Sequence, residues 1–404
     1  MMNVLKHFFN LPFITLIIAI SNVIGPMPHI GGLYPIVILV VLFYLVTKGG
    51  LSGVNSAMAF IIFTAILSTL INNPPVYFKS YQRLGLFIIM AGLFSPLFRS
   101  KRLMLFRYQM FGWMLRVCVI VAVVSFIGYP LGINYMPVSE ALKSQSGAFG
   151  GITLQSMVLG PIAAVSFCYT LCLVLKVRLQ KFSSCKKHFY VFLFLCVASF
   201  LTVLLTASRG SLLAALIGGM MIFYKMFSGA TGKMFRYGFV ITVLLIVTFP
   251  VWKSYTEGVI NKQKGNIEVG GTTSSRNEKW NARMYEFQQS PLWGVGYFAS
   301  LPETGEDFDE VTGQIEFGTS WGAALSTLGL MGFVPLLGLF LSSWFYLYQA
   351  RCDLSSDVPV MLGVLSMFMV HMIVEGYVFG AGSYLFFMVW LSVGAIDAKK
   401  RLSL

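Results

Sequence analysis

Residues 274–287 read Ser-Ser-Arg-Asn-Glu-Lys-Trp-Asn-Ala-Arg-Met-Tyr-Glu-Phe, and they lie in the one long polar interval of the chain, 255–319. Positions i, i+4 and i+7 share one face of a helix, so the spacing predicts that Arg276, Trp280 and Arg283 point the same way. Two guanidinium groups and an indole on one face can hold a phosphate and stack on a sugar or a lipid carrier. An amphipathic helix lying on anionic lipid headgroups fits the same spacing.

Two further segments of the polar interval follow this predicted helix. Residues 290–297 read Ser-Pro-Leu-Trp-Gly-Val-Gly-Tyr, which predicts a turn that ends the helix. The acidic run at 303–310 lacks the alternating Asp/Asn and Gly pattern of a calcium loop, so we interpret it as a solvated loop.

Outside this interval, the composition predicts a membrane protein with many spans. Hydrophobic residues make up 57% of the 404 residues, charged residues only 11%, and the mean hydropathy is +0.77. A soluble domain carries about 25% charged residues. No interval between the apolar segments is long enough to form a separate soluble domain.

The apolar segments predict an all-α bundle of about twelve transmembrane helices, because a helix needs about 20 apolar residues to cross a bilayer. Both termini would be cytoplasmic, and the loop at 255–319 would lie outside with short helices. We expect N-terminal transmembrane helices in 1–150, a transmembrane core in 151–396 that includes the loop, and a cytoplasmic tail in 397–404. The predicted spans are 8–25, 32–47, 55–72, 84–98, 109–128, 152–175, 189–206, 211–227, 237–254, 320–347, 359–377 and 379–396. The tenth is long enough to be tilted or broken.

The net charge of +14 follows the predicted topology and does not indicate nucleic-acid binding. Most of the 29 Lys and Arg residues fall in the predicted cytoplasmic segments, and most of the 15 acidic residues fall outside. This asymmetry is the positive-inside rule. The six cysteines fall in spans or cytoplasmic loops, so the sequence predicts no exported disulfide framework.

Ionisable residues near the outer ends of the spans are further candidates. Arg209 is the only charge in a tight turn at 206–211, where it either anchors a helix end or binds an anion. Glu375 lies at span depth, where an ionisable side chain is a functional candidate, although it can equally be a structural partner of Arg209 or His371. The spacing of four predicts that His371 and Glu375 share a helix face. The sequence contains no Cys/His metal cluster, Ser-His-Asp set or phosphate-binding loop.

Arginines that face outward on an apolar scaffold suit a substrate whose diphosphate leaves as an anion. Arginine forks neutralise the developing charge without a divalent metal, because preorganised charges act strongly in a low-dielectric site. The nucleophile would be a hydroxyl held in line and helped by a general base. We therefore expect no metal and no cofactor.

Five segments, taken in order and with their topology, resemble the O-antigen ligase and polysaccharide polymerase superfamily of bacterial inner membranes. They are 208–213 (SRGSLL), 275–283 (SRNEKWNAR), 291–296 (PLWGVG), 319–332 (TSWGAALSTLGLMG) and 371–380 (HMIVEGYVFG). The resemblance covers about residues 145–396.

The resemblance implies a GT-C-like helical glycosyltransferase that acts on undecaprenyl-diphosphate-linked oligosaccharides at the periplasmic face. It also implies inversion at the anomeric carbon and no metal. In the family, arginines that match Arg209 and Arg276 are thought to hold the donor diphosphate, so we expect both to be catalytic. We expect Glu375, or another outer carboxylate, to be the general base. The expected substrate-binding residues are Arg209, Arg276, Arg283, Trp280 and Trp321.

One departure from the family pattern bears on the reaction. Ligases carry a His-Asn pair just before the span that ends in Leu-Gly-x-x-Gly, whereas residues 318–321 read Gly-Thr-Ser-Trp. This favours a polymerase of O-antigen or exopolysaccharide repeat units, with a ligase onto lipid A core or protein as the alternative. A flippase or other transporter and an assembly scaffold are further alternatives. The expected partners are the bilayer, undecaprenyl-diphosphate-linked glycans, a chain-length regulator and a flippase.

Overall fold

The computed structural model describes residues 10–28, 31, 33–137, 148–179, 186–228, 232, 256, 260, 274–304, 308–309, 313–353 and 355–402. Within them the structure holds twelve α-helices and only two short two-stranded ladders. The ladders pair β1 (Gly53–Val54) with β2 (Phe98–Arg99), and β3 (Phe308–Asp309) with β4 (Gln314–Ile315). The described chain is therefore all-α in class, as predicted.

Eleven helices follow the predicted apolar segments. They are α2 (Leu11–Ser21), α3 (Leu33–Gly49), α4 (Ser56–Asn72), α5 (Ser80–Phe94), α6 (Lys101–Gly128), α8 (Ser156–Leu179), α9 (Lys186–Leu205), α10 (Arg209–Phe227), α15 (Ser320–Gln349), α16 (Val358–Val374) and α17 (Tyr384–Leu402). Among the described residues, five helices are long and apolar enough to cross a membrane: α6, α8, α9, α10 and α15. The predicted span at 237–254 lies outside the described residues, so the total of about twelve spans stays a prediction, as do the three predicted regions.

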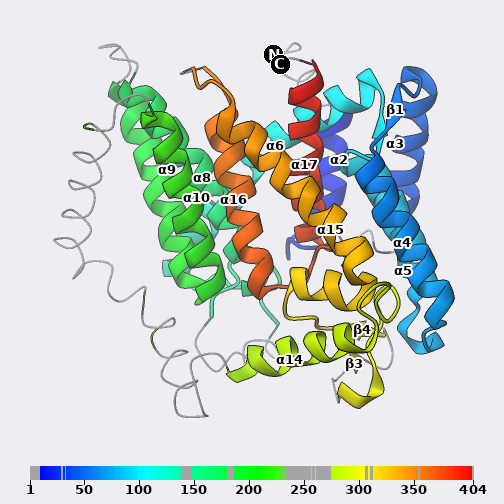
Figure 1. Ribbon diagram of the computed structural model, residues 1–404. Coiled ribbons are helices and arrows are strands. Elements are labelled where there is room, and N and C mark those ends of the chain that lie inside the picture. The colour runs from blue at the N-terminus through cyan, green and yellow to red at the C-terminus, as the bar shows by residue number, and fades with distance from the viewer. Residues whose placement is uncertain are drawn as a thin grey trace.

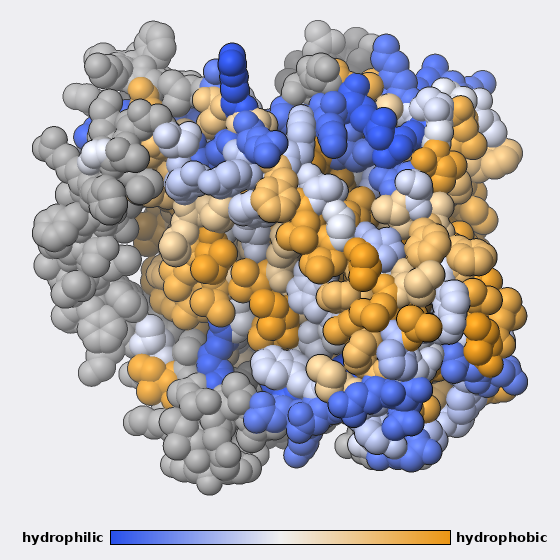
Figure 2. All heavy atoms as spheres, in the orientation of Figure 1, coloured by the Kyte–Doolittle hydropathy of each residue, from blue (hydrophilic) through white to orange (hydrophobic). Residues whose placement is uncertain are grey.

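The apolar helices stand side by side (Figure 1). Helices α8, α9 and α10 form one edge, α3, α4 and α5 form the other, and α15, α16 and α17 lie between them. The twelfth helix, α14 (Ser274–Gln289), lies across the end opposite to the C-terminal end of α17, next to the β3–β4 ladder. Figure 2 shows an apolar belt on the visible face between two polar ends, as expected of a protein embedded in a bilayer.

Helix α15 is broken at Gly329, which confirms the prediction for this segment. Gly329 has φ 61° and ψ −165°, a conformation open only to glycine. The loop at 290–296 fills the break, where the Leu330 amide donates to the Pro291 carbonyl at 2.8 Å. A Cβ atom on Gly329 would lie 2.3 Å from the carbonyl carbon of Leu292, so the close approach also requires glycine.

Helix α4 completes the hydrogen bonding around the break. The Ser68 hydroxyl donates at 2.8 Å to the Thr327 carbonyl, just before Gly329, and the Asn72 amide donates at 2.9 Å to the Gly294 carbonyl. The buried backbone groups that the break releases thus find new partners. Helix α4 consequently holds the loop at 290–296 in place.

Close packing of α10 on α16 fixes the position of the start of α10 and the end of α16, which lie near α14. A Cβ atom on Gly218 of α10 would lie 2.8 Å from the carbonyl oxygen of Gly363 of α16, so the two backbones meet at these glycines. Helix α10 starts at Arg209 after a turn of three residues, and the Ser208 side chain caps it by accepting the Ser211 amide. This confirms the predicted tight turn at 206–211.

Candidate functional site

The predicted outer helix exists as α14 and presents the expected face to the bundle. Arg276 and Trp280 are partly buried and Arg283 is buried, whereas Asn277 and Glu278 are exposed. The helix ends at Gln289, directly before the Ser-Pro turn that the sequence predicts. Helix α14 therefore lies with its predicted binding face against α15.

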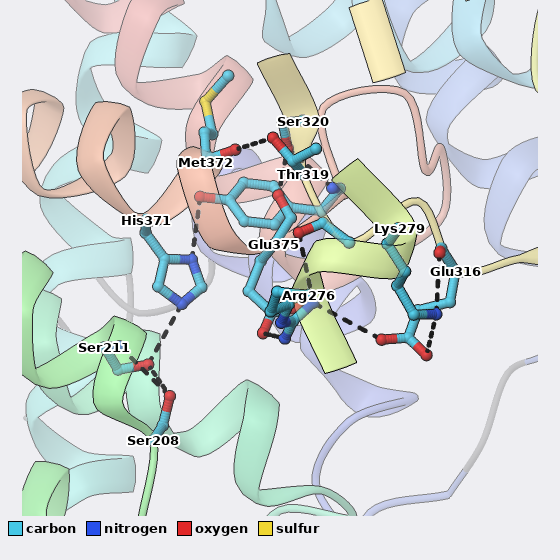
Figure 3. Close-up of polar contacts among 12 residues, drawn as sticks. Ser208, Ser211, Arg276, Lys279, Glu316, Thr319, Ser320, His371, Met372 and Glu375 are labelled. Atoms are coloured by element: carbon cyan, nitrogen blue, oxygen red, sulfur yellow. Dashed lines mark hydrogen bonds and ion pairs between the residues drawn. The ribbon is translucent and has the colours of Figure 1, made fainter. Parts of the chain in front are cut away.

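Arg276 meets two carboxylates and a carbonyl at the end of the bundle (Figure 3). Its Nη2 atom binds Glu375 Oε1, and its Nη1 atom donates to the Gly318 carbonyl at 3.3 Å and lies 3.7 Å from Glu316 Oε1. The side chains of Arg276 and Glu375 are each 20% exposed, so solvent reaches both. The structure thus joins two predicted catalytic residues that lie 99 positions apart in the sequence.

The prediction that His371 and Glu375 share a helix face is wrong. Helix α16 ends at Val374, and Glu375 is extended with φ −140° and ψ 137°. Ser320, the first residue of α15, donates to the Glu375 carbonyl at 2.6 Å and accepts the Tyr377 amide at 3.0 Å. These tertiary hydrogen bonds take the place of the next helical turn, so the Glu375 side chain turns toward α14.

His371 instead lies in a buried polar network behind the Arg276–Glu375 pair. Its ring nitrogens are 3.2 Å from the Ser211 hydroxyl and 3.2 Å from the Tyr377 hydroxyl. Ser211 is in turn 2.8 Å from the Ser208 hydroxyl, in the cap of α10 (Figure 3). The imidazole therefore links the start of α10 to the segment that carries Glu375.

Arg209 opens α10 beside this network. A Cβ atom on the next residue, Gly210, would lie 2.5 Å from the Val374 side chain, so the turn abuts the residue that precedes Glu375. The Arg209 side chain is partly exposed. The structure brings the start of α10 and the end of α16 together, and the role of Arg209 stays a prediction.

Arg283 occupies a different environment from Arg276. Its Nη1 atom lies 2.9 Å from Glu286 Oε2, and the two side chains are only 2% and 0% exposed. Its Nη2 atom donates to the Ser300 hydroxyl at 3.2 Å, and the guanidinium stacks over the Phe317 ring at 5.0 Å. These contacts hold α14 to the following loop, and substrate binding by Arg283 stays a prediction.

A mainly apolar groove of about 310 Å³ runs between α14, α15 and the end of α16. Its walls include Trp280, Phe287, Leu325 and Ile373. The Trp280 indole nitrogen is buried, and no described residue accepts a hydrogen bond from it. Because Trp280 lies one turn after Arg276, the groove starts beside the ion pair.

Trp321, the other predicted tryptophan, lies between α15 and α16. Its indole nitrogen donates to the Met369 carbonyl at 3.1 Å, and its ring packs edge-on against Phe340 with centroids 5.5 Å apart. These contacts fix the start of α15 against α16. Its predicted contact with substrate stays a prediction.

Two charged residues at the site, Lys279 and Glu316, are not among the predicted catalytic or substrate-binding residues named above. Lys279 Nζ lies 2.9 Å from Glu316 Oε2 and donates to the Glu316 carbonyl at 3.1 Å. The spacing of three between Arg276 and Lys279 is a helical signal that points to Lys279. Nothing in the sequence connects Glu316 with either residue. Among the described residues, His, Cys, Asp and Glu side chains form no group of three that could hold a metal ion, and independence from metal stays a prediction.

A protein-family model described as O-antigen ligase matches residues 194–320. This segment includes the turn with Arg209, α14, Lys279 and Glu316, and it ends at Ser320. The match confirms the resemblance to the O-antigen ligase and polymerase superfamily, and it supports a ligase- or polymerase-type glycosyl transfer. A search of curated proteins found no match.

Proposed function

We propose that this protein polymerises undecaprenyl-diphosphate-linked oligosaccharide repeat units at the periplasmic face of the inner membrane. The observation that carries the proposal is the pair formed by the Arg276 guanidinium and the Glu375 carboxylate, one helical turn along α14 from Trp280, which lines an apolar groove. Glycosyl transfer from a lipid-diphosphate donor requires an anion-binding group for the diphosphate, a proton acceptor for the attacking hydroxyl and an apolar groove for the prenyl chain. The match to the ligase and polymerase family supports the same chemistry.

In the proposed reaction, Arg276 and Arg209 bind the donor diphosphate, and the prenyl chain lies in the groove along Trp280. The hydroxyl of the acceptor sugar attacks the anomeric carbon of the donor glycan from the side opposite the diphosphate. The new glycosidic bond forms as the bond to the diphosphate oxygen breaks, which inverts the anomeric carbon. Glu375 takes the hydroxyl proton, and undecaprenyl diphosphate leaves with its charge held by the arginines.

A gel ladder of surface polysaccharide tests this function. A deletion strain is complemented with wild type, Arg276→Gln, or the control Arg102→Gln. Arg102 is an exposed arginine in the first turn of α6, three residues after Arg99, which pairs with Asp397 near the C-terminal end of α17. We expect wild type and the control to restore long chains and Arg276→Gln to leave single repeat units. Normal chains in the deletion strain would exclude a polymerase.

Arg209→Lys tests the second arginine in the same assay. Lysine keeps the positive charge and loses the planar fork that binds two phosphate oxygens at once. We expect shorter or fewer chains from this variant. A normal ladder would exclude a bidentate phosphate contact by Arg209.

A ligase is the second candidate, because the matching family model is described as O-antigen ligase. For a ligase, the deletion strain would hold full-length chains on the lipid carrier and no glycan attached to its final acceptor. Repeat units that accumulate on the cytoplasmic side would instead indicate a flippase. The proposed protein partners, a chain-length regulator and a flippase, are expected only if the protein is a polymerase.

A further inference from the structure

Arg276 and Lys279 form a two-cation cradle that is closed by a carboxylate of the chain itself. The two cations lie one turn apart on α14, and Glu316 reaches both of them from the segment after β4. One of its oxygens is 3.7 Å from Arg276 and the other is 2.9 Å from Lys279 (Figure 3). Two oxygens on one centre, each facing a separate cation, is the arrangement that a phosphate group presents.

The charges of the cluster balance. Arg276 and Lys279 carry two positive charges, and Glu316 and Glu375 carry two negative ones. A diphosphate diester brings two further negative charges, and charge repulsion opposes its entry while both carboxylates stay in place. One of the acids must therefore leave the cations when such an anion binds.

Exposure identifies Glu316 as the acid that leaves. The Glu316 side chain is 61% exposed. Its Oε1 atom, the one that faces Arg276, is 3.7 Å from the guanidinium, beyond hydrogen-bond range. Glu375 is only 20% exposed and binds Arg276 directly. Exposed ion pairs contribute little stability, so an anion with two charges replaces Glu316 easily.

We propose that Glu316 is an internal stand-in for a substrate phosphate, which makes Lys279 a further diphosphate-binding residue beside Arg276 and Arg209. This proposal rests on the proposed function for the identity of the anion, a prenyl diphosphate. When the donor binds, Glu316 swings into solvent and one phosphate takes its place between the two cations. When the product departs, Glu316 returns and helps to expel it.

Binding of farnesyl diphosphate to the purified full-length protein in detergent tests the proposal without any need for turnover. Glu316→Gln removes the competitor, so we expect binding about 1.5- to fivefold tighter, the range that corresponds to one exposed ion pair. Lys279→Gln removes a charged donor, so we expect binding about tenfold weaker or more. Lys279→Arg should stay within about threefold of wild type, because it keeps the charge.

Glu278→Gln is the matched control, because Glu278 is an exposed acid on the same helix. It removes the same charge and should leave the affinity unchanged. A second arm replaces farnesyl diphosphate with phosphatidylglycerol, a lipid with one phosphate. We expect weak binding that none of the variants alters.

Two results would overturn the proposal: equal affinity of wild type and Glu316→Gln, or equal affinity of wild type and Lys279→Gln. Phosphatidylglycerol binding with the same dependence on the variants would overturn it too, because the site would then hold headgroups. The glycan ladder tests the polymerase function separately. If the variants showed the expected binding pattern but the deletion strain had a normal ladder, the anion site would be supported and the polymerase function would be excluded.

Discussion

Arg276 and Arg283 share one face of α14, yet their surroundings differ so much that their substitution should have different effects. The Arg276 side chain is 20% exposed and Arg283 is 2% exposed, paired with a buried glutamate. A partly hydrated ion pair adds little to stability, whereas a buried charge that loses its partner is costly. We therefore expect one arginine to serve the reaction and the other to serve the fold.

Arg276→Lys keeps the positive charge and loses the fork that reaches Glu375 and Gly318 together. Removal of one preorganised donor to a developing anion typically lowers a rate by about 100-fold or more. We expect a loss of that order in glycan polymerisation by membranes supplied with lipid-linked repeat units, with an unchanged melting temperature. Arg102→Lys, at the opposite end, is the control and should retain full activity. Full activity of Arg276→Lys would mean that the fork is not needed.

Arg283→Ala leaves Glu286 buried without its cation. We expect a loss of about 3–5 kcal/mol in the free energy of unfolding, measured by denaturant titration in detergent. The double variant Arg283→Met/Glu286→Leu removes both charges and should recover much of that loss. If Arg283→Ala were as stable as wild type but inactive, Arg283 would act on substrate instead.

Local spacing could predict which residues of α14 face the bundle, but it could not predict their partners. Arg276, Trp280 and Arg283 follow from helical periodicity alone. Glu316 and Glu375 reach α14 through tertiary structure, 37 and 99 positions along the chain from the residues they bind. The error at His371 and Glu375 has the same origin, because hydrogen bonds from the start of α15 decide where α16 ends.

At the level of elements, the break in α15 depends on one glycine. Gly329→Ala forces a side chain into a conformation that disfavours it, with Cβ 2.3 Å from the Leu292 backbone. We expect a loss of about 2–4 kcal/mol in the free energy of unfolding. Gly338→Ala in the same helix is the control, since a Cβ there meets nothing within 4 Å. Alanine has a higher helix propensity than glycine, so Gly338→Ala should be as stable as wild type or slightly more stable. Equal stability of both variants would mean that the α15 break does not require glycine.

The length of the apolar segment at 320–347 indicated that this helix would be tilted or broken, and the structure shows the break at Gly329. The position of the break could not be predicted, because it depends on contacts with the loop at 290–296 and with α4. Most helix bounds agree with the apolar segments to within several residues, since burial in lipid requires long uncharged runs.

For the whole molecule, charge asymmetry predicts that α14 lies on the periplasmic side of the inner membrane and that the basic start of α6 lies on the cytoplasmic side. Glu278→Cys and Arg102→Cys place exposed thiols at these two ends, in a background with Cys185→Ser and Cys352→Ser. We expect a membrane-impermeant maleimide to label position 278 once the outer membrane is permeabilised, and position 102 only after the inner membrane is opened. The reverse pattern would invert the topology and exclude a periplasmic site.

The loop that fills the break in α15 also sets the order in which the site assembles during synthesis. Pro291 leaves the ribosome before its partner Leu330, and Arg276 leaves long before Glu375. The loop at 290–296 is therefore complete while the groups that satisfy its hydrogen bonds are still to be synthesised. It reaches its final form only after α15 and α16 have been inserted. A nascent chain arrested before α16 holds Arg276 without Glu375, so the pair at the centre of the candidate site exists only on a chain that has been synthesised beyond α16.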